Sequence, residues 1–265
     1  MSVITLTKKQ YSKLDRWYDF FEKNNTLHNI LYDPSWIIMF AQLKANPKFN
    51  KLNDKLKQET KRNNRIKIYP LPSHIFKAFS VTPANNVKVV IIGQDPYFNH
   101  EVYKNRYVPQ AMGLSFSVPR GITIPSSLSN IFANLLKFGH IKQKPTSGNL
   151  WFWAVQGCLM LNTALTVEDG SKKSHTNLWL WFTDYIIEYI STYMNDVIFV
   201  LWGGDAYKKI SLIDLDKHHT IISSHPSGLS ANRPFRTYPS FMDEDHFGKI
   251  NEILVSTNRT KILWE

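Results

Sequence analysis

The stretch of sequence that decides the fold runs Val87-Lys-Val-Val-Ile-Ile-Gly-Gln-Asp-Pro-Tyr97. A run of Val and Ile without polar alternation is typical of a strand that is covered on both faces, as in a parallel sheet. Gly93 lets the backbone turn sharply, and Pro96 prevents the chain from continuing as sheet or helix. Asp95 therefore follows the carboxyl end of a central strand, where open α/β sheets place their ligands.

Three further apolar runs end in polar or glycine residues in the same way. Residues 157–163 end around Asn162, and residues 196–204 end at two glycines. Residues 219–227 end at two serines and His225. If the runs are parallel neighbours, the acid, the amide and the imidazole that follow them converge on one edge of the sheet and form a candidate site.

Patterns with helical spacing separate these runs, for example at residues 177–194. Strands that alternate with helices predict a parallel sheet with right-handed crossovers. We therefore expect an α/β fold with a central, twisted sheet of four parallel strands and helices on both faces. We place residues 34–265 in this single domain.

Residues 1–33 form an N-terminal helical extension in this interpretation. Leu14, Trp17 and Phe21 recur at helical spacing, so we expect a helix that packs on the core. A second helix is expected over residues 34–43, because Pro34 and Ser35 suit a helix start.

The composition excludes several classes of protein. A chain of 265 residues with 43% hydrophobic residues can bury a full core, which argues against disorder. No apolar run approaches the length that spans a bilayer, and residues 1–7 lack the features of a secretory signal. The single Cys158 excludes an internal disulfide and a cysteine-based zinc site, and it fits a reducing, intracellular compartment.

The net charge of +11 points to a polyanionic partner. A basic surface attracts nucleic acid because binding releases counterions, although it also serves solubility. Much of the charge lies in residues 44–67. We interpret these residues mainly as a solvated helix face that leads into a loop, with DNA contact as the alternative.

Three segments resemble the signature segments of a known family. They are Gly93-Gln-Asp-Pro-Tyr97, Leu161-Asn-Thr-Ala-Leu-Thr-Val167 and His225-Pro-Ser-Gly-Leu-Ser230. In this order, each at an expected strand end, they are similar to the motifs of family 1 uracil-DNA glycosylases. Supporting matches extend the resemblance over about residues 34–264. Richness in Asn, Lys and Ile hints at an A+T-rich genome, such as that of a large DNA virus.

The resemblance implies a DNA repair enzyme that flips uracil out of DNA and hydrolyses its N-glycosidic bond. Free uracil leaves, and an abasic site remains for base excision repair. The implied enzyme is a monofunctional monomer without metal or cofactor, which acts on uracil in single- and double-stranded DNA and at no membrane. The resemblance leaves replication proteins open as partners. The nucleus, the cytoplasm or a viral replication compartment would each fit.

Two residues carry the catalytic roles that the resemblance implies. Asp95 would orient the attacking water and stabilise the positive charge that develops on the sugar. His225 would donate a hydrogen bond to uracil O2 as negative charge builds there, for which a neutral imidazole suffices. Without the motifs, Asp95 would be interpreted as a turn residue and His225 as one of nine structural or exposed histidines.

Four residues would bind the uracil base. The Asn162 amide offers a donor and an acceptor that match uracil and not cytosine, unless it only caps a turn. Gln94 would contact the base through its backbone or its side chain, and its alternative role is that of a turn residue. Tyr97 would exclude the methyl group of thymine, and Phe116 would stack on the base. Both rings also suit ordinary core packing.

Four further residues would grip the DNA. Ser127, Ser174 and Ser227 would contact successive phosphates through their hydroxyls and nearby backbone N–H groups. Leu229 would enter the duplex as a wedge where the uracil leaves, unless it folds back onto the core. Each assignment depends on its motif, because a lone serine is usually solvated surface.

The chain departs from the family pattern near the expected site. Phe98 and Met112 stand where the family usually has histidines, and Gly228 replaces a usual proline in the wedge loop. An insertion lengthens the segment 98–112, where His100 replaces a lost polar contact or the loop simply bulges into solvent. We expect activity to survive these changes.

Two other classes of function stay open. One is a non-catalytic DNA-binding subunit of a polymerase assembly, which loss of Asp95 or His225 would favour, but both are present. The other is a glycosylase for a different base, which a small residue in place of Tyr97 would favour. A phosphate-binding or metal-dependent hydrolase is disfavoured, because the sequence has no Gly-rich loop ending in Lys-Ser/Thr and no clustered metal ligands.

Overall fold

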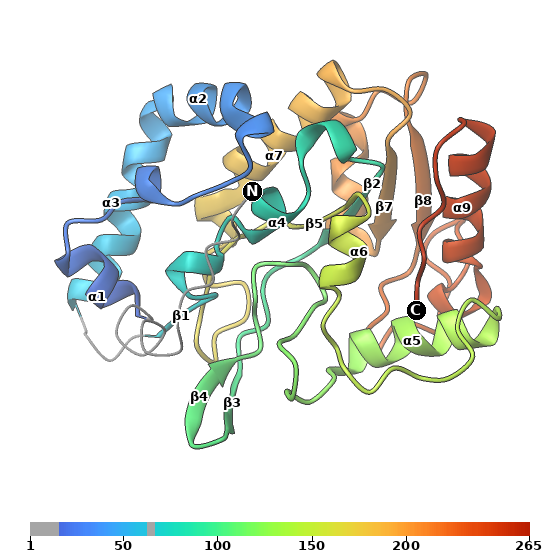
Figure 1. The fold of residues 1–265 in the computed structure, drawn as a ribbon, viewed down its shortest axis with the longest axis horizontal. Coiled ribbons are helices and arrows are strands. Elements are labelled where there is room, and N and C mark those ends of the chain that lie inside the picture. Colours follow the sequence, from blue (N-terminus) through green and yellow to red (C-terminus); the bar gives the residue numbers. More distant parts are fainter. Residues whose placement is uncertain (1–15, 63–66) are drawn as a thin grey trace.

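The computed structural model describes residues 16–62 and 67–265 (Figure 1). The helices are α1 Trp17–Glu22, α2 Ile37–Ala45, α3 Pro47–Arg62, α4 Lys77–Val81, α5 Ser126–Lys137, α6 Trp151–Val155, α7 Thr176–Tyr193, α8 Gly204–Tyr207 and α9 His246–Ser256. The strands are β1 Ile68–Tyr69, β2 Val89–Gly93, β3 His100–Tyr103, β4 Arg106–Pro109, β5 Cys158–Asn162, β6 Val167–Glu168, β7 Ile198–Trp202 and β8 His219–Ser223. Short 3-10 turns connect several of these elements.

A sheet of four parallel strands forms the centre of the molecule, in the order β5-β2-β7-β8. At the carboxyl ends of the strands, Gly93 lies opposite Asn162 and Trp202 lies opposite Ser223. Every residue of β2, β5 and β7 is buried, as their unbroken apolar sequences require, whereas the edge strand β8 is partly exposed. The predicted four-stranded parallel α/β fold is confirmed.

Helices pack around the sheet through aromatic side chains. Phe40, Phe76 and Phe182 form a buried cluster that joins α2 to α7, with ring centroids 5.0 to 6.3 Å apart. Trp153 of α6 meets Trp264, near the chain end, at 5.1 Å between ring centroids. Figure 1 shows α2 and α3 at one end of the molecule and α9 at the other. Burial of each such ring stabilises the fold by about 2–3 kcal/mol.

The predicted N-terminal helix is present as α1. Trp17 and Phe21 are buried, and the indole N–H of Trp17 donates to the Pro70 carbonyl oxygen at 2.8 Å. Leu14 lies outside the described residues. The second predicted helix begins as a 3-10 turn at Pro34–Trp36 and continues as α2. The division of the chain at residue 33 stays a prediction.

The basic segment of the chain lies largely on α3. Phe49, Leu52 and Leu56 face the core, whereas Lys51 and Lys55 are exposed, so this helix has the solvated basic face that the sequence predicts. Within residues 16–62 and 67–265, no helix is long and apolar enough to cross a membrane.

The insertion in segment 98–112 forms an antiparallel hairpin of β3 and β4. Lys104 and Asn105 form its two-residue turn, and both have positive φ angles, 49° and 59°. That backbone follows the right-handed twist of the strands. His100 does not line the pocket described below, because its ring lies within hydrogen-bond distance of Tyr69 and Asp169. The outer part of the hairpin extends into solvent, as the second alternative states, with Val102 and Tyr107 exposed.

Candidate active site

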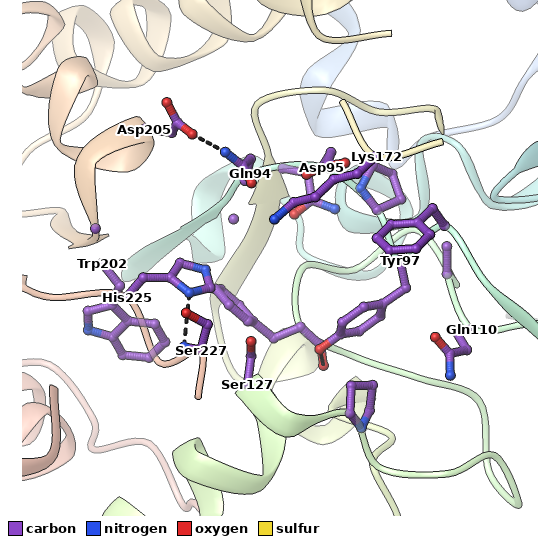
Figure 2. A pocket seen from close by; sticks show the side chains of 18 of the residues that line it. Gln94, Asp95, Tyr97, Gln110, Ser127, Lys172, Trp202, Asp205, His225 and Ser227 are labelled. Carbon is purple, nitrogen blue, oxygen red and sulfur yellow. Dashed lines mark hydrogen bonds between the residues drawn. The ribbon is translucent and has the colours of Figure 1, made fainter. Parts of the chain in front are cut away.

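A pocket of about 590 Å³ opens at the carboxyl ends of the central strands (Figure 2). Asp95, Asn162 and His225 follow or end three different strands, and all three line this pocket, as the sequence pattern predicts. The other lining residues are 93–94, 96–99, 110–114, 116, 125–127, 172, 202–206 and 227. The parallel order of the sheet therefore brings together side chains that are far apart in the sequence.

Asp95 is half-buried on one wall of the pocket. Its Oδ2 accepts a hydrogen bond from the backbone N–H of Lys173 at 2.9 Å. Burial raises the pKa of this carboxyl above its ordinary value, while the Lys173 N–H and the nearby Lys172 and Lys173 charges oppose that rise. A carboxylate that has lost part of its hydration interacts strongly with positive charge that develops beside it.

His225 lies across the pocket from Asp95, and one hydrogen bond fixes its tautomer. The backbone N–H of Ser227 donates to His225 Nδ1 at 3.0 Å, so the proton of the neutral ring is on Nε2 (Figure 2). Burial, together with the nearby Lys172 charge, lowers the pKa of His225 to about 4. At neutral pH the ring is therefore uncharged and carries a donor on Nε2.

Asn162 ends β5 with its side chain buried in the pocket wall. None of the hydrogen bonds among the described residues involves the side-chain amide of Asn162, so both its donor and its acceptor are available to a ligand. Gly93 makes room for this side chain, because a Cβ atom at position 93 would lie 2.1 Å from Asn162 Oδ1. Gly93 of the first motif thus leaves the space that the Asn162 amide of the second motif occupies.

The side chain of Gln94 is committed to the protein. Its Nε2 donates to the Asp205 carboxylate, and its backbone carbonyl accepts from the Thr163 hydroxyl at 2.6 Å. Asp205 also pairs with Lys173 at 3.0 Å. Gln94 therefore connects the turn after β2 to Asp205 of α8. Asp205 in turn holds Lys173, whose backbone N–H binds Asp95.

Tyr97 and Phe116 are joined at the side of the pocket. The Tyr97 hydroxyl donates to the Phe116 carbonyl oxygen at 3.2 Å, which fixes the Tyr97 ring against the pocket. Phe116 has a positive φ of 61°, a strained conformation for a bulky residue that the surrounding structure must hold. Its ring lies 5.6 Å from Trp202 and 5.8 Å from His225, centroid to centroid.

The four residues expected to grip DNA divide into two groups. Ser127 and Ser227 line the pocket. Ser174 does not, and its hydroxyl accepts a hydrogen bond from the Glu168 backbone N–H at 2.8 Å. Leu229 is 87% exposed, so it does not fold back onto the core.

Comparisons with known proteins agree with the motifs. A family model described as the uracil DNA glycosylase superfamily matches residues 79–255. The chain belongs to this superfamily. The predicted resemblance is thereby confirmed.

Two similar proteins show how far the likeness extends. The protein named probable uracil-DNA glycosylase of Acanthamoeba polyphaga mimivirus is 39% identical over 247 residues, which are 89% of this chain and 65% of that protein. The uracil-DNA glycosylase of Psychromonas ingrahamii is 42% identical over 231 residues, which are 87% of this chain and 100% of that protein.

A solved structure has the same fold throughout. The crystal structure of mimivirus uracil-DNA glycosylase superposes with a TM-score of 0.91 at 37% identity, over 100% of this chain and 99% of that one. The arrangement of the four strands and the surrounding helices is therefore that of a uracil-DNA glycosylase.

Two of the departures from the family pattern lie in one wall of the pocket. Phe98 and Met112 both line it, and the Ser117 hydroxyl donates to the Met112 sulfur at 3.1 Å. Phe98 and Met112 thus make this wall more apolar than it would be with the two histidines that the family usually has at these positions. Gly228 stands in open space, with no atom within 4 Å of a Cβ built on it.

Two further residues that line the pocket, Lys172 and Asp205, were not predicted from the sequence. Figure 2 shows Lys172 beside Asp95, and its charge acts on both Asp95 and His225. Lys172 lies two residues before Ser174, so its nearness to a motif is the one signal that the sequence offered. Asp205 comes just after the carboxyl end of β7, as Asp95 comes just after that of β2, and this position is the signal that the sequence offered for it. Long-range packing brings Lys172 to the site.

Proposed function

We propose that this chain flips uracil out of DNA and hydrolyses the bond between uracil N1 and the sugar C1′. The observation that supports it most is the meeting of Asp95, Asn162 and a neutral His225 around one pocket, in a chain of this superfamily. A pocket of this volume suits one flipped base.

In the proposed reaction the C1′–N1 bond breaks with its electron pair passing to uracil. Positive charge develops on the sugar, and the Asp95 carboxylate stabilises that charge and orients a water molecule. The water oxygen bonds to C1′, and its proton leaves through Asp95 to solvent. Such electrostatic stabilisation gains most in the transition state, where it increases the rate.

His225 would stabilise the negative charge that develops on the departing uracil. Because Nδ1 accepts from Ser227, Nε2–H is the donor that would meet uracil O2. A neutral donor suffices here, since the low pKa keeps the ring uncharged at the working pH. No step of this scheme requires a metal ion or a cofactor.

Two contacts would select uracil over the other pyrimidines, and a third would hold the base in place. The free Asn162 amide would pair with N3–H and O4, a pattern that cytosine reverses. The fixed Tyr97 ring would clash with the methyl group of thymine. Phe116 would stack on the base.

The DNA around the flipped base would be held by small and exposed side chains. Ser127 and Ser227, and more distantly Ser174, would bind phosphates on the uracil strand. Leu229 would occupy the gap left in the duplex, which its 87% exposure permits. We propose that the protein acts as a monomer on single- and double-stranded DNA.

The test is cleavage of an oligonucleotide that carries one uracil, in EDTA, beside matched thymine and cytosine strands. Abasic sites from uracil alone, with a fall of about 10³-fold in kcat for Asp95→Asn, would support the proposal. Metal dependence, or equal activity of Asp95→Asn, would refute it. Tight binding without base release by the wild type would indicate a DNA-binding scaffold instead.

A further inference from the structure

The β3–β4 hairpin rises directly from the rim of the pocket. Asn99 and Gln110, which flank its two strands, both line the pocket, and the Gln110 backbone N–H donates to the Asn99 carbonyl oxygen at 3.0 Å. Figure 1 shows the hairpin projecting from the body of the molecule on the side where α5 lies. Any DNA that delivers a base to the pocket must pass close to this projection.

The base of the hairpin is anchored on both sides. Glu101 accepts hydrogen bonds from Gln110 Nε2 at 2.9 Å and from the backbone N–H and hydroxyl of Thr123 at 3.1 and 2.9 Å. On the other side, His100 Nδ1 lies 3.0 Å from Asp169 Oδ1. These contacts hold the projection in a fixed direction relative to the pocket.

The outer part of the hairpin combines exposed rings with positive charge. Tyr107 is 69% exposed, and Lys67 Nζ lies 4.5 Å from its ring centroid. Lys104 Nζ lies 5.3 Å from the ring centroid of Tyr103. Arg106 is exposed on the adjacent strand. Within the described residues, no carboxylate forms an ion pair with these three cations.

We infer that this tip binds the DNA strand beside the flipped uracil, through its phosphates and the faces of its bases or sugars. Exposed rings with neighbouring cations are the features that bind nucleic acid strands with little sequence preference. The surface is continuous with the pocket rim and complements a polyanion, which favours DNA over a protein partner. The inference rests on the proposed function, because it takes the pocket as the place where the base enters.

The turn offers a variant that removes charge without unfolding the hairpin. Lys104 holds a positive φ that glycine adopts at no cost, so Lys104→Gly relieves the backbone while it removes the amine. Arg106→Thr retains strand propensity in β4. The charge-matched control is Lys217→Ala/Lys261→Ala, since Lys217 precedes β8 and Lys261 follows α9, at the opposite edge of the sheet.

The experiment compares two uracil oligonucleotides, one with about ten nucleotides on each side of the uracil and one with a single nucleotide on each side. Affinity is measured by fluorescence anisotropy in an Asp95→Asn background, and KM and kcat are measured with Asp95 present. For Lys104→Gly/Arg106→Thr we expect affinity for the long strand to fall about 10-fold. The slope of log affinity against log salt should fall by about 1.5, because two phosphate contacts are lost. The kcat, and the KM for the short strand, should not change.

Equal affinity of variant and wild type for the long strand would overturn the inference, as would an equal loss on the short strand. An equal loss in the control pair would also overturn it, because total charge would then be the cause. If the hairpin variant weakens binding of the long strand while no uracil is released even by the wild type, the inference stands and the proposed activity fails.

Discussion

The wall of the pocket that the sheet supplies differs in construction from the rim that the loops supply. Asp95, Asn162 and His225 lie at or just after strand ends and retain the family motifs, and hydrogen bonds of 2.9 and 3.0 Å hold Asp95 and His225. In the loops, Phe98 stands where the family usually has a histidine, and Leu229, the proposed wedge, is 87% exposed beside Gly228, around which there is open space. The residues proposed for catalysis thus keep the family motifs at the strand ends, whereas the departures from the family pattern lie in the loops.

The largest effect should come from adding a side chain at Gly93, at the end of β2 beside Asn162. We expect Gly93→Ala to lower kcat/KM for uracil by about 10²–10³-fold, because the new Cβ would displace the Asn162 amide by an ångström or more. Gly228→Ala is the matched control, since the same substitution meets open space there. Steady-state kinetics on a uracil oligonucleotide measures both, and similar losses in the two variants would contradict the comparison.

A second variant removes the side chain that should exclude thymine. We expect Tyr97→Ala to raise the rate of thymine excision at least about 10-fold above that of the wild type, because the clash with the methyl group is lost. Release of free base from paired uracil and thymine strands measures the change. An unchanged preference for uracil would show that another group, such as Phe98, excludes the methyl.

Protonation of His225 should weaken the folded state. The pKa of His225 is about 4 when folded, against 6.5 in an unfolded chain, so the unfolded chain takes up the proton first as pH falls. The free energy of unfolding should therefore decrease from pH 6.5 to about 4. The pKa values of His28, His74 and His246 shift in the same direction, so His225→Gln should remove about a quarter to a third of that slope. Urea unfolding across this pH range measures the free energy of unfolding. If His225→Gln left its slope against pH unchanged, His225 would not have a lowered pKa in the folded protein.

The smallest effect is expected on the rim. Gly228→Pro should raise kcat/KM by no more than about 5-fold, because it lowers the entropy that is lost when the wedge loop orders on DNA. Adding Phe98→His to this variant should not lower activity. A large fall in activity for the double variant would show that the rim has been rebuilt around Phe98 and Gly228 rather than merely relaxed.

The sequence by itself determined the sheet and the place of the site. Unbroken apolar runs that stop at Gly93 and Asn162, with a motif after each, predict buried parallel strands, and the carboxyl ends of parallel strands share one edge of the sheet. The motif at His225 added the third side chain. These predictions succeeded because strand burial and strand polarity are local properties of the chain.

Only the tertiary structure decided the state and the surroundings of these groups. The neutral tautomer of His225 depends on the Ser227 N–H and on burial, and the carboxylate of Asp95 depends on a backbone N–H that lies 78 residues away. Lys172 entered the site, and the Ser174 hydroxyl turned to Glu168, through packing that no periodic pattern encodes. Distances and electric fields between residues remote in sequence exist only once the chain has folded.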